Sequence, residues 1–263
     1  MSLEILSNTP SVSNGSTIVF CHGAWHDARC WQPTMMPYFA DKGFQCIAPS
    51  YRNHGQSTSK GSLKFRRISE YVEDVASVVN NLPSDQKVYL IGHSMGGLVV
   101  QKFLENYPNR IEKAALIASV PPQGVWRVTL KSLFQHPLTF LKVNLIWSLA
   151  PLISPSTLVK ELFYSEKFTD SDVLIAMEKL QDESYLAYLD MLIFNLPNPK
   201  KIKTPIHVIG GEKDYIFSKH EVEQTAQAYN TTALILRGEA HNLFSESQWE
   251  VAAESILHFF NKS

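Results

Sequence analysis

The chain has 263 residues, of which 44% are hydrophobic and 19% are charged, and its formal net charge at pH 7 is −1. A chain of this length and composition can bury the core of one large α/β domain and still carry an inserted subdomain. The balanced charge gives no reason to expect nucleic acid or an anionic surface as a partner.

Up to residue 118, apolar strand-like runs alternate with helix-like patterns. Short continuous apolar runs are typical of strands that are buried on both faces. Several of the helical patterns stop at a glycine or a proline, as at Gly43 and Pro108. In chain order, we predict a short edge strand over 3–6, a strand over 17–21, a helix over 30–42, a strand over 44–48, a helix over 69–82, a strand over 88–91, a helix over 94–107 and a strand over 113–118.

The alternation stops between residues 121 and 199, where the chain is apolar and aromatic and prolines divide it into short helices. It resumes with a strand over 206–209, a helix over 218–229, a strand over 233–236 and a final helix over 245–260. Strands that alternate with helices predict an α/β fold with a mostly parallel central sheet flanked by helices. We therefore predict a core formed by residues 1–120 and 200–263, with 121–199 as an inserted helical cap.

Cysteine usage and the apolar runs predict a cytoplasmic protein. The first ten residues have neither a basic region nor a sustained apolar run, so no signal peptide is expected. The most apolar stretch, 140–153, is too short and too polar to cross a bilayer, which predicts no integral membrane association. Cys21, Cys30 and Cys46 are odd in number and lack metal-ligand spacing, so no metal site is expected. Cys21 and Cys46 lie in or beside apolar strand-like runs, which predicts buried free thiols there.

A possible nucleophile lies between the strand over 88–91 and the helix that follows it. Ser94 has glycines two residues to either side, at positions 92 and 96, in the pattern G-x-S-x-G. A strand-to-helix turn this sharp strains the serine backbone and leaves no room for a Cβ atom at Gly92 or Gly96. The strain exposes the hydroxyl beside the amide groups that begin the new helix. Ser94 still needs a base, an acid that orients the base, and donors for an oxyanion.

Two further strands end in residues that supply the base and the acid. Asp214 follows the strand over 206–209, and His241 follows the strand over 233–236. The carboxyl ends of parallel strands meet at one edge of the sheet, so we expect Ser94, His241 and Asp214 to lie together there. Taken alone, Asp214 reads as a turn carboxylate and His241 as an ordinary surface histidine. Glu212 is a rival for the acid.

Over residues 18–260 the chain resembles the α/β-hydrolase superfamily, and the segments 22–24, 92–97, 211–214 and 238–241 carry the resemblance. Residues 22–31 are similar to small esterases related to plant methyl esterases and hydroxynitrile lyases. Met95 after the serine is similar to monoacylglycerol lipases and lysophospholipases. The resemblance implies an α/β-hydrolase fold in which the backbone N–H groups of Ala24 and Met95 form the oxyanion hole.

Three positions depart from relatives within that superfamily. Asn53 stands where many members have glycine in the loop after the second long strand, which weakens any assignment to a subfamily. Asn242 stands where hydroxynitrile lyases have lysine, which argues against a cyanohydrin lyase. The nucleophile is Ser94 and not aspartate, which argues against haloalkane dehalogenase and epoxide hydrolase chemistry.

The sequence therefore predicts a serine hydrolase that cleaves a carboxylic ester with an apolar acyl or aromatic portion, through an acyl-enzyme and without a metal or organic cofactor. We expect a small-molecule ester as the partner, and a monomer or homodimer. C–C bond hydrolysis or perhydrolysis on the same residues is an alternative, and a small-molecule receptor or a relict scaffold is a further one. The expected substrate contacts are aromatic: Trp25, Trp126, Phe134 and Trp147.

Overall fold

The computed structural model describes residues 1–262 and contains a seven-stranded sheet in the order β1-β3-β2-β4-β5-β6-β7. Only the pairing of β1 with β3 is antiparallel, and all the other pairs are parallel. The predicted α/β class is confirmed. Residue 263, the last of the predicted core, lies outside the described residues. The strands are β1 (Ile5–Asn8), β2 (Ser16–Cys21), β3 (Gln45–Pro49), β4 (Lys87–His93), β5 (Lys113–Ile117), β6 (Ile206–Gly211) and β7 (Ala233–Leu236).

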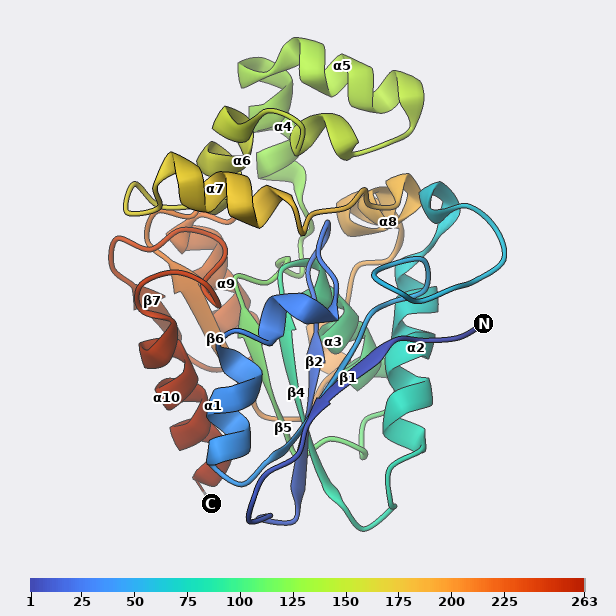
Figure 1. Ribbon diagram of the computed structural model, residues 1–263, viewed down its shortest axis with the longest axis vertical. Coiled ribbons are helices and arrows are strands. Elements are labelled where there is room, and N and C mark those ends of the chain that lie inside the picture. The colour runs from blue at the N-terminus through green and yellow to red at the C-terminus, as the bar shows by residue number, and fades with distance from the viewer. Residues whose placement is uncertain (263) are drawn as a thin grey trace.

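Helices cover both faces of this sheet (Figure 1). Alternate residues of β4 show the two layers, because Val88 and Leu90 join one apolar cluster while Tyr89 and Ile91 join the other. The first cluster includes α2 (Ile68–Asn80), α3 (Met95–Asn106) and α9 (Lys219–Ala228), and the second includes α1 (Met35–Asp41) and α10 (Trp249–Asn261).

Two predicted helices have different bounds in the structure. The pattern over 30–42 is divided into a 3-10 turn, Ala28–Trp31, and α1, because Pro33 has no amide hydrogen to continue the first turn. The final helix begins at Trp249 and not at residue 245. Residues 242–248 instead form a turn in which Ser245 N donates to the carbonyl oxygen of Asn242 at 2.8 Å.

Residues 121–199 form a run of short helices between β5 and β6, at the end of the molecule opposite the C-terminus (Figure 1). The helices α4 and α5 lie farthest from the sheet. A proline is the first residue of α5. No helix among residues 1–262 is long and apolar enough to cross a membrane. The α-helices of this segment are α4 (Trp126–Gln135), α5 (Pro137–Ile146), α6 (Ser156–Phe163), α7 (Asp170–Met177) and α8 (Tyr185–Leu189), with a π-helical turn over Asp190–Phe194.

Buried carboxylates join this segment to the rest of the chain. Glu183, which is fully buried, accepts hydrogen bonds from Tyr71 Oη at 2.9 Å and pairs with His54 Nε2 at 3.0 Å. Asp190, also fully buried, pairs with Arg67 and accepts from the amide of Ile68 at 3.0 Å. Removing either carboxylate would leave its partners buried and unpaired, so both contacts hold residues 183–190 firmly on the loop after β3 and on α2.

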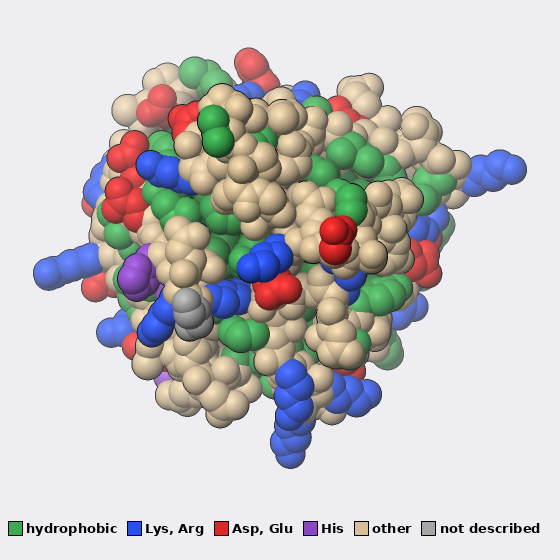
Figure 2. Space-filling model, turned by 90° about the horizontal axis from the view of Figure 1, so that it is seen from below, with side chains coloured by type: hydrophobic (Ala, Val, Ile, Leu, Met, Phe, Trp, Pro, Cys, Tyr) green, Lys and Arg blue, Asp and Glu red, His purple; other side chains and the backbone are tan. Residues whose placement is uncertain are grey.

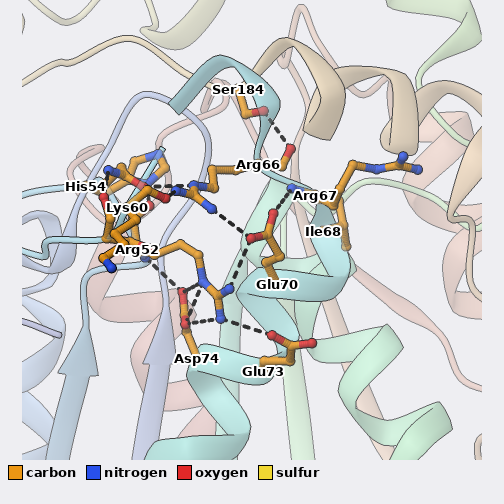
Figure 3. Close-up of polar contacts among 12 residues, drawn as sticks. Arg52, His54, Lys60, Arg66, Arg67, Ile68, Glu70, Glu73, Asp74 and Ser184 are labelled. Carbon is orange, nitrogen blue, oxygen red and sulfur yellow. Dashed lines mark hydrogen bonds and ion pairs between the residues drawn. The ribbon is translucent and has the colours of Figure 1, made fainter. Parts of the chain in front are cut away.

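The loop after β3 is itself held by an ion-pair network (Figure 3). Arg52 contacts Asp74 at 2.7 Å and Glu70 and Glu73 at 3.1 Å, all on α2. Asp74 is fully buried, so this pair is shielded from solvent. Ser184 Oγ reaches the same region and donates to the carbonyl oxygen of Arg66 at 2.6 Å.

Candidate active site

Ser94 follows β4 directly and has a left-handed backbone with φ 53° and ψ −119°. The flanking glycines are required by contact. A Cβ atom at Gly92 would lie 2.5 Å from the carbonyl oxygen of Gly96, and one at Gly96 would lie 2.1 Å from that of Cys21. The strained turn that the sequence predicts is therefore confirmed, and it holds the serine at the carboxyl edge of the sheet.

The structure brings the three predicted side chains together. His241 Nε2 lies 3.0 Å from Ser94 Oγ, and His241 Nδ1 lies 2.8 Å from Asp214 Oδ2. The other carboxylate oxygen of Asp214 accepts hydrogen bonds from the amides of Ile216 and Phe217 at 2.7 and 3.0 Å. These amides fix the carboxylate in place. With Asp214 holding a proton on Nδ1, Nε2 is free to accept the proton of the serine.

The rival acid lies elsewhere. Glu212 Oε2 accepts a hydrogen bond from the amide of Gly238 at 3.0 Å, at an exposed position. Its side chain braces the turn between β7 and the loop of His241, while Asp214 contacts the imidazole itself. Of the two carboxylates, Asp214 is therefore the one placed to orient His241.

Other histidines support this loop. His93 Nε2 donates to the carbonyl oxygen of His241 at 3.0 Å, and their ring centroids lie 4.8 Å apart. Burial lowers the pKa of His93 well below its ordinary value, so this ring is neutral. Burial also lowers the pKa of His26 to about 4. His22 Nε2 accepts a hydrogen bond from the amide of Tyr51 at 3.1 Å and ties the loop after β2 to the loop after β3.

The amides predicted to form an oxyanion hole lie beside the serine. A Cβ atom at Gly23 would lie 3.1 Å from Ser94 Cβ, so the loop that carries Ala24 packs directly on the strained turn. Met95 is the first residue of α3. Within residues 1–262, neither the Ala24 nor the Met95 amide donates a hydrogen bond to the protein. Both are therefore available to an acceptor at Ser94, and their role stays a prediction.

Ser94 opens into an apolar cavity with a volume of about 90 Å³. The loops at the edge of the sheet form one side, and helices of the segment 121–199 form the other. Trp25 lines it, as the sequence predicts, and its ring meets Phe163 edge-on at 5.4 Å. The lining residues are Ala24, Trp25, Ser94, Val120, Ile216 and Phe217 from the sheet side, and Val125, Val128, Thr129, Ser132, Phe140, Val143, Leu149, Leu152, Leu162, Tyr188 and Met191 from the segment 121–199.

Three of the predicted aromatic contacts do not line this cavity. Trp126, Phe134 and Trp147 are 48%, 79% and 49% exposed. The helix α4 turns Val128, Thr129 and Ser132 inward, which puts Trp126 and Phe134 on its outer side, and Trp147 stacks on Tyr185 with ring centroids 5.5 Å apart. Aromatic content alone could not show which side of each short helix faces the site.

Sequence reasoning missed several residues of the cavity. Ile216 and Phe217 come just after Asp214, and their position after the end of a strand could have predicted that they lie near the site. Tyr188 and Met191 gave none, because the helices that carry them reach the site only through tertiary packing. No group of three or more His, Cys, Asp or Glu side chains in residues 1–262 is arranged to hold a metal ion.

A mostly parallel sheet with a serine on a strained strand-to-helix turn defines an α/β hydrolase. The family described as serine aminopeptidase, S33, matches residues 13–248, and the chain belongs to this family of hydrolases.

Similar proteins include esterases. A bifunctional esterase/perhydrolase from Acinetobacter calcoaceticus is 36% identical over 107 residues, which cover 40% of this chain and 37% of that protein. Methylesterase 3 from Arabidopsis thaliana is 28% identical over 105 residues, 40% of each chain. These matches span about two-fifths of the length of the curated relatives. An esterase from Exiguobacterium antarcticum superposes with a TM-score of 0.74 at 16% identity, covering 99% of this chain and 96% of that one, which shows a shared fold.

Proposed function

We propose that the protein is a serine esterase that hydrolyses a carboxylic ester with an apolar acyl or aromatic portion, beneath a cap formed by residues 121–199. The observation that supports it most directly is the 3.0 Å contact between Ser94 Oγ and His241 Nε2 at the wall of an apolar cavity. A hydroxyl is a poor nucleophile until a base accepts its proton, and the Asp214 contact to Nδ1 keeps the base in the tautomer that can do so.

In the proposed reaction, Ser94 Oγ attacks the ester carbonyl while His241 Nε2 takes the hydroxyl proton. The oxyanion accepts hydrogen bonds from the amides of Ala24 and Met95, each of which lowers the barrier by about 3 kcal/mol. His241 then gives its proton to the leaving alcohol, and an acyl-enzyme remains. Water, deprotonated by His241, attacks this acyl group and releases the acid and the free serine.

The cavity limits the size of the apolar group. One water molecule needs roughly 10–15 Å³ of a cavity, so about 90 Å³ accepts a group of roughly six to nine heavy atoms. Its walls are almost wholly aliphatic and aromatic, with hydroxyls only at Ser94, Thr129, Ser132 and Tyr188. This favours a short acyl chain or a single ring over a charged acid portion.

The first test is labelling with a fluorophosphonate, which reacts with activated serines. We expect labelling of the wild type and its loss in both Ser94→Ala and His241→Ala. Ser94→Ala should also reduce turnover of p-nitrophenyl butyrate by at least about a thousandfold without unfolding the protein. Wild-type rates in a purified Ser94→Ala variant would disprove the assignment of the nucleophile.

A series of p-nitrophenyl esters tests the substrate. Each methylene buried in the cavity should raise kcat/KM by about fourfold until the cavity is full. A strong preference for acetate over every longer chain would contradict the proposed apolar acyl portion.

The match to a bifunctional esterase/perhydrolase supports a second activity on the same residues. In perhydrolysis, hydrogen peroxide replaces water as the attacking group, and the acyl-enzyme is released as a peracid. Peracid formation from an ester and added hydrogen peroxide, absent in Ser94→Ala, would establish it, and hydrolysis without any peracid would exclude it.

A further inference from the structure

The outer face of α4 and α5 exposes large apolar side chains to an unusual degree. Of the eighteen exposed large hydrophobic residues in the described chain, thirteen lie within residues 121–199. Phe134 and Leu138 are the most exposed of these, at 79% and 81%. We call the following six residues the α4–α5 face: Leu133, Phe134, Leu138, Leu141, Leu145 and Ile146.

The helix α5 is apolar on both of its sides. Phe140 and Val143 point inward and line the cavity at Ser94. Leu138, Leu141 and Leu145 follow the spacing i, i+3, i+7, which puts them together on the opposite side, and they are 81%, 54% and 72% exposed. A helix that is apolar all round is ordinarily buried all round, but α5 lies at the extremity of the molecule (Figure 1). Its outer side therefore lacks the partner that its composition requires.

Two lysines beside this face take part in no ion pair. Helices α4 and α5 contain no aspartate or glutamate. Outside them, Glu221 pairs with Arg127, and Glu161 lies 3.5 Å from His136 at the junction of the two helices. Lys142 is exposed between the leucines of α5, and Lys64 Nζ donates to the carbonyl oxygen of Ile146 at 2.9 Å. Neither Lys142 nor Lys64 is among the ion pairs of residues 1–262. Lys142 and Lys64 are therefore the cations that this face offers to an anionic partner.

We propose that the α4–α5 face docks on an anionic lipid surface, with its leucines and Phe134 inserted among the acyl chains and its lysines at the headgroups. Exposed leucines beside unpaired cations are the features that hold a helix in the plane of such an interface. Docking does not depend on the chemistry at Ser94, so it goes beyond the proposed function. It would bring the cavity-lining side of α5 next to a source of apolar esters.

A second copy of the chain fits this face less well. A twofold contact would put the α4–α5 face of one copy against the same face of the other, so that each face would cover a Lys142 side chain. Neither helix carries a carboxylate, and Glu161, beside the junction of the two helices, lies 3.5 Å from His136. The opposite end of the molecule differs, because Figure 2 shows small groups of hydrophobic side chains there interrupted by Lys, Arg, Asp and Glu. A lipid surface would thus meet the protein at one end only.

The test is flotation with vesicles of phosphatidylcholine, with and without phosphatidylglycerol, using wild type and Ser94→Ala. We expect both proteins to bind the vesicles that contain phosphatidylglycerol, and salt to weaken this binding. The double variant Leu138→Gln/Leu145→Gln should bind at least about tenfold more weakly. Lys142→Glu should lose about tenfold on the anionic vesicles alone. Leu138, Leu145 and Lys142 do not line the cavity, so these two α4–α5 variants should turn over a soluble ester like the wild type.

Matched controls carry the same chemical changes away from the α4–α5 face. Val251→Gln removes an exposed apolar side chain on α10, and Lys87→Glu reverses a charge at the start of β4. Both should bind vesicles like the wild type. The proposal is overturned if the wild type binds neither kind of vesicle, or if the controls lose as much binding as the α4–α5 variants. It is also overturned if sedimentation shows a wild-type dimer that Leu138→Gln/Leu145→Gln dissociates, since a second copy would then occupy the face. Loss of ester turnover in Ser94→Ala concerns the proposed function and leaves these outcomes unaffected.

Discussion

The imidazole of His93 holds the backbone of His241, with Nε2 3.0 Å from the carbonyl oxygen of the second histidine. The residue before the proposed nucleophile, Ser94, thus supports the proposed base, His241. Because burial keeps His93 neutral, the contact joins a neutral donor to a carbonyl and adds no charge beside the reacting groups.

His93 is therefore expected to position His241. His93→Phe keeps a ring but removes the donor, and it should reduce kcat about tenfold to a hundredfold with little change in KM, because a small displacement of the base suffices for such a loss. His93→Gln retains an N–H at a similar distance and should recover most of kcat. A merely structural role predicts lower thermal stability in both variants and the same kcat per folded molecule.

Substitutions of Asp214 and of the nearby Glu212 should have very different effects on kcat. Asp214→Asn preserves shape but no longer selects the Nδ1–H tautomer of His241, and kcat should fall about ten thousandfold. Glu212→Gln loses only the charge of the contact to the amide of Gly238 and should keep kcat within about twofold. Steady-state kinetics on one soluble ester measures both, and equal losses would show that the acid is wrongly assigned.

A buried pair of carboxyls should make stability depend on pH. Glu246 accepts from the amide and hydroxyl of Ser165, both at 2.7 Å, and burial, together with neighbouring Glu239, raises the pKa of Glu246 to about 7. Burial opposes ionisation of Glu239, but hydrogen bonds, foremost that from Lys167, outweigh it and lower its pKa to about 2. The contacts to Ser165 and Lys167 tie the loop of His241 to residues between α6 and α7.

Glu246 and Glu239 change the stability of the protein with pH in opposite directions, because the folded state shifts their proton binding in opposite ways. Between its unfolded value of about 4.5 and about 7, Glu246 holds more proton in the folded state, so its contribution to stability is lost as pH rises through this window. Glu239 acts oppositely, and its contribution is lost as pH falls from about 4.5 through about 2. Glu246→Gln mimics the protonated acid. Its advantage over the wild type in the free energy of unfolding should therefore grow by about 2 to 3 kcal/mol from pH 5 to pH 8. Urea unfolding at pH 5 and pH 8 measures this change, with the exposed Glu250→Gln as control. The prediction is wrong if Glu246→Gln and the wild type differ by the same free energy of unfolding at both pH values.

The two sides of α5 offer a test of the cavity. Val143→Phe fills space at Ser94 and should lower kcat/KM for p-nitrophenyl hexanoate at least about fivefold while sparing the acetate. Leu141→Phe adds the same ring on the exposed side and should change neither substrate. If both variants affect the two esters alike, the acyl group does not enter this cavity.

Residues that follow strands could be predicted from sequence, because a parallel sheet puts the carboxyl ends of its strands at one edge whatever the loops do. This is why Ser94, Asp214 and His241 meet as expected. The predicted cap, residues 121–199, differs from the strand ends in this respect. Trp126 and Phe134 point outward because short helices of mixed composition carry little information about which side is buried, and packing against distant loops decides it.

Glu183 and Asp190 show the same limit. Neither carboxylate belongs to a recognisable motif, yet both are fully buried against partners more than a hundred residues away. Only the folded chain reveals that such a residue fastens one helical segment to the core.

The left-handed backbone of Ser94 has a consequence for the energetics of the whole protein. Glycine adopts φ near 53° without penalty, whereas serine does so at a cost of about 1–3 kcal/mol. Ser94→Gly should therefore melt at a higher temperature than the wild type although it cannot turn over an ester. The strain at Ser94 thus trades stability for a positioned hydroxyl. Thermostabilisation that selects on melting temperature alone would favour variants that lack this hydroxyl and have no activity.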